Sequence, residues 1–279
     1  MINLKEHTFN SENKTYVIAE IGINHGGNIE VAKNLIESAS KTGCDAVKFQ
    51  TYLTEKRAPK GNQEVFDILK KCELPFEDFL QLKKISDNLG IEFFSTPFDT
   101  ESLDYLDSID VNVFKIASFD VVNLEFLRQI AKKGKPIIMS VGMANFEEIK
   151  IAHDLLNGED SSLALLHCIS AYPTQESEAN LSAMKILQKE FSDCAIGQSD
   201  HTDDIKVPLY AVAMGAKIIE KHYKIVSNMD CVDSPVSITQ DQMTKMVNEI
   251  RNLEEIMGEE EIKISKAQES ATIFRRPVE

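Results

Sequence analysis

Short apolar runs alternate with longer amphipathic stretches along most of this chain. We interpret the short runs as buried strands and the stretches between them as helices, since their apolar residues recur at helical spacing. The expected strands lie at 16–20, 46–50, 92–96, 113–117, 136–141, 163–168, 195–199 and 217–222. The expected helices include 29–41, 76–89, 124–133, 145–156 and 204–214, with 240–257 as the closing helix.

Eight strands, each followed by a helix, predict an α/β fold of one domain, a closed parallel (β/α)8 or TIM barrel. The competing architecture is a doubly wound open sheet, which usually carries a GxGxxG loop after its first strand. Here the first strand continues as EIGINHGG, which lacks that spacing. We therefore expect a catalytic barrel over residues 1–257 and an extended C-terminal tail, the remnant of a linker, over 258–279.

Charge and cysteine content narrow the possible partners and the compartment. The net charge of −15 makes nucleic acid and anionic membranes poor partners. The polar N-terminus has no apolar run that could be a signal peptide or a membrane span. An odd number of cysteines, with no CxxC pair, argues against a disulfide framework and favours a cytoplasmic protein with reduced thiols. They are Cys44, Cys72, Cys168, Cys194 and Cys231.

Nearly every predicted strand ends in polar residues that a hydrophobic core would not favour. The carboxyl ends of the strands meet on one face of a (β/α)8 barrel, where catalysis occurs. Lys48 and Gln50 are two positions apart and point to the same side of their strand. The polar strand ends comprise Glu20, Lys48, Gln50, Thr96, Lys115, Ser118, Ser140, His167, Ser199, Asp200, His201, Glu220 and His222.

These residue types indicate an anion site beside a metal site. Lysines within DAVKFQ and VFKIAS must face a cavity or an anion, because an unpaired buried ammonium is very costly. His201 and His222 follow consecutive strands, each near a carboxylate, and are candidate metal ligands. His167 lies inside the apolar run LALLHC and is expected to be structural. Together the lysines, hydroxyls, metal and Glu20 suit the attack of an enolpyruvate on an aldehyde, and they would also suit other carbon–carbon bond chemistry.

Eight local strings make the interpretation more specific. The chain resembles the N-acetylneuraminate (sialic acid) synthase family, which includes the legionaminic and pseudaminic acid synthases, with every motif in order from the first strand to the closing helix. The strings are AEIGINHGG (19–27), DAVKFQTY (45–52), FFSTPF (93–98), FKIAS (114–118), SVGM (140–143), HCISAYPT (167–174), IGQSDHT (196–202) and EKH (220–222).

The resemblance implies that phosphoenolpyruvate, water and an open-chain acetamido-hexose give a nine-carbon 2-keto acid plus phosphate. It implies His201 and His222 as ligands of Mn²⁺ or Mg²⁺, and Glu20 as the acidic residue near the reacting carbon. The residues that resemble phosphoenolpyruvate contacts are Lys48, Thr96, Lys115, Ser118, Ser140, Ser170 and Ser199. Those that resemble sugar contacts are Gln50, Asn62, Asp120, Tyr172 and Asp233.

The chain departs from the family at three points. Asp120 stands where several members have glutamate, and Ser170 stands where sialic acid synthases have asparagine, which leaves the acceptor sugar open. Full-length members continue into an antifreeze-like lid, whereas this sequence ends in what resembles the linker, at Glu279. We expect a homodimer, with a separate lid protein as a further possible partner.

Two other functions remain open at this point. A Schiff-base aldolase on the same barrel would use Lys48 or Lys115 as its nucleophile. A non-catalytic subunit could bind a sugar or phosphoenolpyruvate without a lid.

Overall fold

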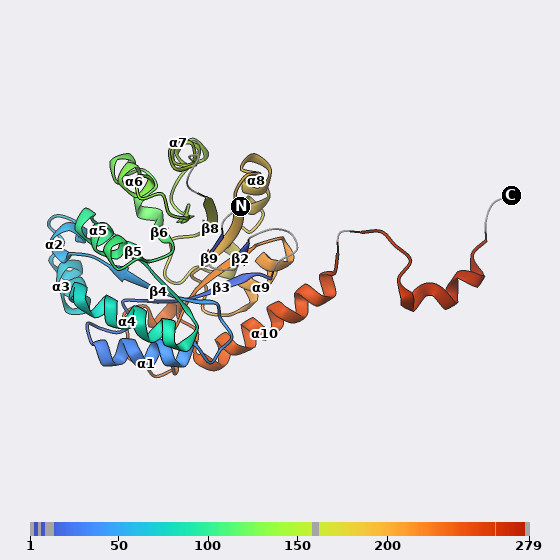
Figure 1. Ribbon diagram of the computed structural model, residues 1–279, viewed down its shortest axis with the longest axis horizontal. Coiled ribbons are helices and arrows are strands. Elements are labelled where there is room, and N and C mark those ends of the chain that lie inside the picture. The colour runs from blue at the N-terminus through green and yellow to red at the C-terminus, as the bar shows by residue number, and fades with distance from the viewer. Residues whose placement is uncertain (1–2, 5–6, 9–13, 158–161, 260, 277–279) are drawn as a thin grey trace.

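Eight parallel strands form a closed barrel in the computed structural model of this chain (Figure 1). The structure describes residues 3–4, 7–8, 14–157, 162–259 and 261–276. Around the barrel the strand order is β10-β3-β4-β5-β6-β7-β8-β9, so the last strand pairs with the first and closes it. The strands are β3 (Tyr16–Gly22), β4 (Ala46–Thr51), β5 (Glu92–Pro97), β6 (Phe114–Ile116), β7 (Ile137–Ser140), β8 (Leu163–Cys168), β9 (Ala195–Asp200) and β10 (Ile218–His222).

Helices surround the strands in the order predicted for a (β/α)8 barrel, which confirms the fold class. The outer helices are α1 (Ile29–Ala39), α4 (Phe76–Leu89), α5 (Thr100–Ser108), α6 (Leu124–Ala131), α7 (Phe146–Leu156), α8 (Ala183–Glu190), α9 (Lys206–Ala213) and α10 (Gln240–Met257). Two more helices, α2 (Thr54–Arg57) and α3 (Gln63–Cys72), lie in the connection after β4. A short hairpin of β1 (Asn3–Leu4) and β2 (His7–Thr8) lies before the barrel.

Local chemistry fixes where several helices start and end. Asn145 and Glu148 form a reciprocal capping box at the start of α7, and Thr239 and Gln242 form another at α10. Gly90 ends α4 in the left-handed conformation, with a φ of 73° that suits glycine. The sequence analysis did not predict α2, α3, α5 or α8, and it extended α1 by two residues beyond its observed end.

Two apolar layers hold the barrel together. One layer fills the space between the strands and the helices and includes Val17, Ala19 and Ile21 of β3. The other fills the inside of the barrel and includes Tyr16 and Ile18 of the same strand. Successive side chains of β3 thus point alternately outward and inward, as the pleat of a strand requires.

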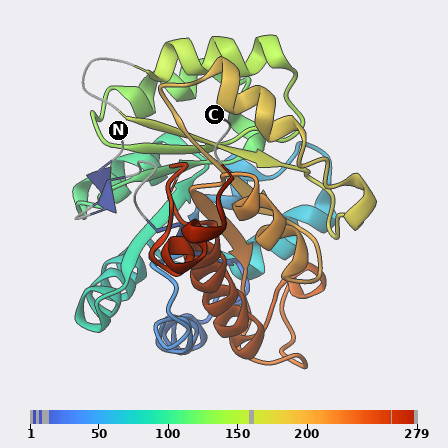
Figure 2. The ribbon, with the colours of Figure 1, turned by 90° about the vertical axis from the view of Figure 1, so that its right-hand side faces the viewer.

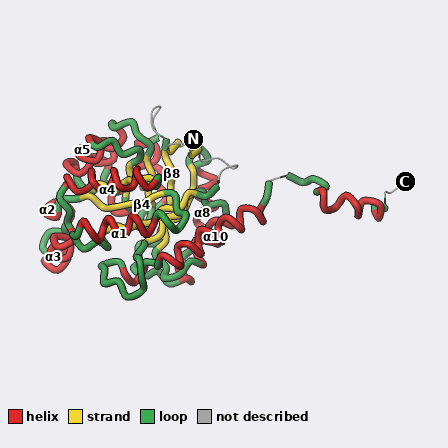
Figure 3. The backbone as a smooth tube through the Cα atoms, turned by 60° about the horizontal axis from the view of Figure 1, so that its bottom comes forward, coloured by secondary structure: helices red, strands yellow, loops and turns green. Residues whose placement is uncertain are grey.

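After α10 the chain leaves the barrel. Figures 1 and 3 show the described residues after Gly258 extending away from the barrel, with a short helix, η4 (Lys266–Phe274), near the end. Figure 2, turned by 90° so that the tail comes toward the viewer, shows η4 in front of α10. Within the described part of the chain, no helix combines the length and apolarity needed to cross a membrane.

Candidate active site

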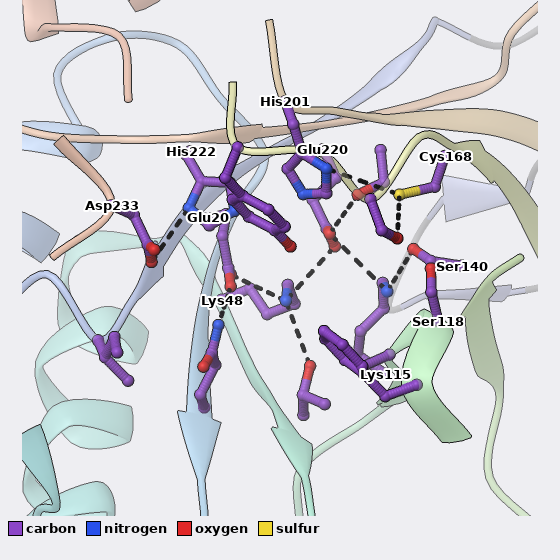
Figure 4. Close-up of a pocket in the computed structure, with 18 of the residues that line it drawn as sticks. Glu20, Lys48, Lys115, Ser118, Ser140, Cys168, His201, Glu220, His222 and Asp233 are labelled. Carbon is purple, nitrogen blue, oxygen red and sulfur yellow. Dashed lines mark hydrogen bonds and ion pairs between the residues drawn. The ribbon is translucent and has the colours of Figure 1, made fainter. Parts of the chain in front are cut away.

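A polar pocket of about 230 Å³ opens at the carboxyl ends of the strands (Figure 4). It brings together most of the site residues that the sequence suggested. Each strand of the barrel, or the loop that follows it, contributes at least one of the residues that line the pocket. The suggested residues that line it are Glu20, Lys48, Gln50, Thr96, Lys115, Ser118, Ser140, Ser170, Tyr172, Ser199, His201, His222 and Asp233.

The pleat of the strands explains why these side chains meet. On β4, Ala46 belongs to the inner apolar layer, and Lys48 lies two residues further toward the carboxyl end. The same two-residue step leads from Val113, just before β6, to Lys115, and on β10 from Ile218 to Glu220. Each of these strands therefore contributes an apolar side chain to the interior of the barrel and, two residues nearer its carboxyl end, a polar side chain to the pocket.

Lys48 is the centre of the first half of the site. Its ammonium lies 2.9 Å from Oε2 of Glu20 and donates to the hydroxyl of Thr96 at 3.2 Å. The amide of Gln50 donates to the other oxygen of Glu20 at 3.0 Å. Both charged side chains are almost completely buried, so the pair sits in a weakly screened environment.

Lys115 is the centre of the second half. Its ammonium donates to Ser140 Oγ at 2.7 Å and to the carbonyl of Ile116 at 3.0 Å. Glu220 connects the halves, with its carboxylate 3.8 Å from Lys115 Nζ and 3.7 Å from Lys48 Nζ. Ser199 donates to the same carboxylate at 2.9 Å.

Burial and this charge network displace the pKa values of the acidic and basic groups. Burial raises the pKa of Glu20 to about 7, although Lys48 opposes the change. Burial lowers the pKa of Lys115 to about 8, with Glu220 opposing it. The pKa of Glu220 is lowered, because Lys115 and Lys48 more than offset its burial. Near neutral pH the site therefore combines an acid and an ammonium that can both exchange protons.

Two glycines allow the polar groups to approach closely. A Cβ on Gly142 would lie 2.6 Å from Ser170 Oγ and 2.9 Å from Ser118 Oγ, so a larger residue there would displace these hydroxyls. The amide of Gly142 itself donates to Ser118 Oγ at 3.0 Å. Gly22 has a φ of 56°, and a Cβ there would lie 3.1 Å from a carboxylate oxygen of Glu20. Glycine at both positions keeps space open for a ligand.

The two candidate metal ligands lie side by side in the lining of the pocket, and both are buried. The ring centroids of His201 and His222 are 5.3 Å apart. His201 Nδ1 bonds to the carbonyl of Ile169 at 2.8 Å, and Figure 4 shows its other ring nitrogen facing the pocket. His222 Nδ1 is buried without a hydrogen-bond partner among the described residues, 3.5 Å from a carboxylate oxygen of Asp233.

This donor set fits a divalent cation. Two imidazoles with a neighbouring carboxylate form a typical first-row metal site. The pKa of His222 is lowered well below its usual value by burial and by His201, so the ring stays neutral, as a ligand must be. The described residues also contain a tight trio of possible ligands elsewhere, in which His153 of α7 meets Asp193 and Cys194, the two residues before β9.

Two suggested sugar contacts do not line the pocket. The exposed Asn62 starts α3, where its side chain accepts a hydrogen bond from the amide of Val65. Asp120 is bonded by Asn123 at 3.2 Å, and the neighbouring Phe119 lines the pocket instead. His167 lies below the pocket and bonds the carbonyl of Ala179 at 2.8 Å, which agrees with the structural role expected for it.

The pocket also contains residues to which the sequence analysis gave no role. Glu220 was noted in the sequence as a polar strand end but was given no role. It lies two residues before His222, so both side chains point to the same face of β10, and its proximity to the inward-facing lysines could have been anticipated from that. Arg57, Phe98 and Ile23 line one wall of the pocket. Arg57 lies on the short helix α2, where no strand pattern indicates which way a side chain points.

Fold and pocket together define a TIM-barrel protein with a site of the kind that enzymes build, charged and assembled from all the strands. A sequence model of the NeuB family matches residues 35–262. The chain belongs to the NeuB family.

Named relatives and a solved structure agree with this assignment. N,N'-diacetyllegionaminic acid synthase of Legionella pneumophila is 38% identical, over 90% of this chain and 75% of its own length. Pseudaminic acid synthase of Campylobacter jejuni is 33% identical, over 96% of this chain and 82% of its own. The crystal structure of an N-acetylneuraminic acid synthetase from Leptospira borgpetersenii superimposes with a TM-score of 0.95 at 36% identity, covering 98% of this chain and 95% of that one.

Proposed function

We propose that this protein condenses phosphoenolpyruvate with an acetamido-hexose aldehyde and water, giving a nine-carbon nonulosonic acid and phosphate. The observation that carries the proposal is the pair of buried lysines, Lys48 and Lys115, facing a pocket rich in hydroxyl groups. Relatives that cover nearly all of the chain are named as synthases of such acids.

Phosphoenolpyruvate would bind at the lysines. Its carboxylate and phosphate need cations and hydroxyl donors, and charge-assisted hydrogen bonds of this kind are the strong ones. In the ligand-free protein the ammonium of Lys48 lies close to Glu20 and that of Lys115 close to Glu220. The anionic groups of phosphoenolpyruvate would take over as partners of the two lysines. The remaining donors on this side would be Thr96, Ser118, Ser140, Ser170 and Ser199.

The acceptor sugar would lie on the other side of the pocket, near Gln50, Tyr172 and Asp233. Glu20 stands between the two substrates, bonded to both Lys48 and Gln50. With a pKa of about 7 it can hold or release a proton beside the reacting carbon.

His201 and His222, with Asp233 beside them, would hold Mn²⁺ or Mg²⁺. When bound there, such an ion would polarise the aldehyde of the acceptor. The structural support is the buried, unpartnered Nδ1 of His222 and the pocket-facing nitrogen of His201.

We also propose a cytoplasmic homodimer, in which residues 1–257 form the catalytic barrel and 258–279 a tail. The free thiols of all five cysteines suit a reducing compartment. A mouth open to solvent needs closure to commit a substrate. The tail of a partner subunit, with Arg275 and Arg276, or a separate lid protein would provide it.

Phosphate release tests the proposed function. The protein is incubated with phosphoenolpyruvate and a panel of acetamido sugars, with Mn²⁺ or after thorough chelation. Release that depends on both the sugar and the metal supports the proposal. A lysine adduct trapped by borohydride, with activity that survives chelation, would instead establish the Schiff-base aldolase. Binding of substrates without turnover would identify a non-catalytic subunit.

A further inference from the structure

Arg57 is a cation in the wall of the pocket that the proposed chemistry does not yet use. Its Nη1 atom is buried and has no hydrogen-bond partner among the described residues. Its guanidinium also forms no ion pair with a described carboxylate, although Asp233 and Glu20 act on it electrostatically. Arg57 as a whole is half-buried, and a cationic side chain with a buried, unpartnered donor atom is costly unless a ligand satisfies that donor.

Two aromatic rings hold this guanidinium in place. Its central carbon lies 4.4 Å from the ring centroid of Tyr52 and 4.0 Å from that of Phe98. The Tyr52 ring is itself fixed, because its hydroxyl donates to the carbonyl of Leu69 at 2.9 Å and the side chain is buried. Cation–π contacts on two sides orient the planar group before any ligand arrives.

Arg57 lies on a different part of the pocket wall from Lys115 and the serine hydroxyls, although Lys48 and Thr96 of the proposed phosphoenolpyruvate site lie on the strands beside it. Arg57, Ile23 and Phe98 follow the neighbouring strands β4, β3 and β5. The hydroxyls of Ser118, Ser140 and Ser170 belong to or follow β6, β7 and β8. The pocket thus has a hydroxyl-rich wall on one side. On the neighbouring strands, Arg57, Ile23 and Phe98 follow the strand-borne polar residues Glu20, Lys48, Gln50 and Thr96.

We infer that Arg57 is a specificity residue that donates to the acetamido carbonyl of the acceptor sugar, whose methyl group packs against Ile23 and Phe98. An acetamido group combines one strong acceptor oxygen with one apolar methyl, which matches this wall. A sugar phosphate matches it poorly, since Asp233 and Glu20 act electrostatically on the same guanidinium and would repel a dianion. The inference rests on the proposed function, because it takes the acceptor to be an acetamido sugar.

The test compares an acetamido-hexose with the parent hexose that carries a hydroxyl in its place, in the wild type, Arg57→Gln and Arg57→Lys. The wild type is expected to prefer the acetamido sugar by roughly tenfold or more in kcat/KM, the effect of one charged hydrogen bond. Arg57→Gln should lose most of that preference and Arg57→Lys part of it, while the KM for phosphoenolpyruvate stays unchanged. Arg128→Met, a change of an exposed arginine on α6, serves as the control and should leave every value unchanged.

The result can overturn the inference in three ways. If Arg57→Gln weakens both sugars equally, Arg57 only supports the wall. If it selectively weakens the use of a 6-phosphorylated acetamido sugar, the guanidinium binds a phosphate instead.

Equilibrium binding of the acetamido-hexose to the wild type and to Arg57→Gln tests the inference independently of catalysis. Binding that is lost in the variant supports the inference even if no sugar is condensed, and wild-type protein that binds none of the sugars contradicts it. If Arg57→Gln fails to fold, the same comparison is made with Arg57→Lys and Phe98→Leu.

Discussion

Replacing Glu220 by glutamine should lower the stability of the ligand-free protein and at the same time increase its affinity for phosphoenolpyruvate. Glu220 is the negative charge shared by two buried ammoniums, 3.7 Å from Lys48 Nζ and 3.8 Å from Lys115 Nζ. The variant keeps the shape of the side chain and its bond to Ser199, so the main change is the loss of charge. Two cations are then left facing the pocket with less compensation.

The size of the effect follows from the geometry. Removing one partner of a buried ion pair costs about 3–5 kcal/mol, and we take about 3 because the contacts are longer than hydrogen bonds. At about 2 °C per kcal/mol for a domain of this size, Tm should fall by about 6 °C. Removing the repulsion between Glu220 and a bound anion should lower the Kd of phosphoenolpyruvate by about tenfold, or about 1.4 kcal/mol.

Thermal denaturation with and without phosphoenolpyruvate measures both effects. The assay belongs at about pH 6, because the pKa of Lys115, about 8 in the intact site, falls further when Glu220 is neutral. A ligand at about 100 times its Kd stabilises a protein by about 2.7 kcal/mol, so saturating phosphoenolpyruvate should restore most of the lost Tm.

The chain provides a matched control. Asp200 and Lys221 form another buried ion pair, 2.6 Å long, and neither is among the described residues that line the pocket. Asp200→Asn should lower Tm in the same way but gain no extra stabilisation from phosphoenolpyruvate. If both variants respond equally to phosphoenolpyruvate, or if Glu220→Gln binds it more weakly than the wild type, the reasoning about the lysine pair is refuted.

Three further predictions concern the same pocket. His201→Ala and His222→Ala should each abolish turnover while circular dichroism shows an intact fold; full activity in either variant, or in chelated wild type, would reject the metal role. Lys115→Met should raise the KM for phosphoenolpyruvate far more than that for the sugar, by the equivalent of about 1.5–3 kcal/mol; equal KM values in variant and wild type would mean that Lys115 does not contact the anion. Because burial lowers the pKa of Lys115 to about 8, its charge is present below that pH and lost above it. The kcat/KM for phosphoenolpyruvate should therefore fall as pH rises through about 8, and a flat profile there would exclude Lys115 as the group that binds it.

The site residues that lie on strands could be predicted well from the sequence, because side chains alternate between the two faces of a pleated strand. Once Ala46 is assigned to a buried strand, Lys48 and Gln50 must follow it on the same face. The same reasoning placed Lys115 and His222 correctly, because the barrel brings all strand ends to one face.

Loop residues could not be predicted in the same way. Asn62 and Asp120 were suggested by resemblance alone, and each sits where its side chain is engaged by a local hydrogen bond. Arg57 was missed for the converse reason. Its orientation depends on the nearby ring of Tyr52 and on that of Phe98, which is distant in sequence and meets Arg57 only in the folded chain.

Mass spectrometry of the reaction product tests the central claim most directly. The protein is given phosphoenolpyruvate labelled with ¹³C at every carbon, together with the acetamido sugar that best stimulates phosphate release. The account predicts a 2-keto acid that contains all the carbons of the sugar and all the labelled carbons of phosphoenolpyruvate, formed in equal amount with phosphate. Phosphate released together with labelled pyruvate, and no product joining the two carbon chains, would contradict it.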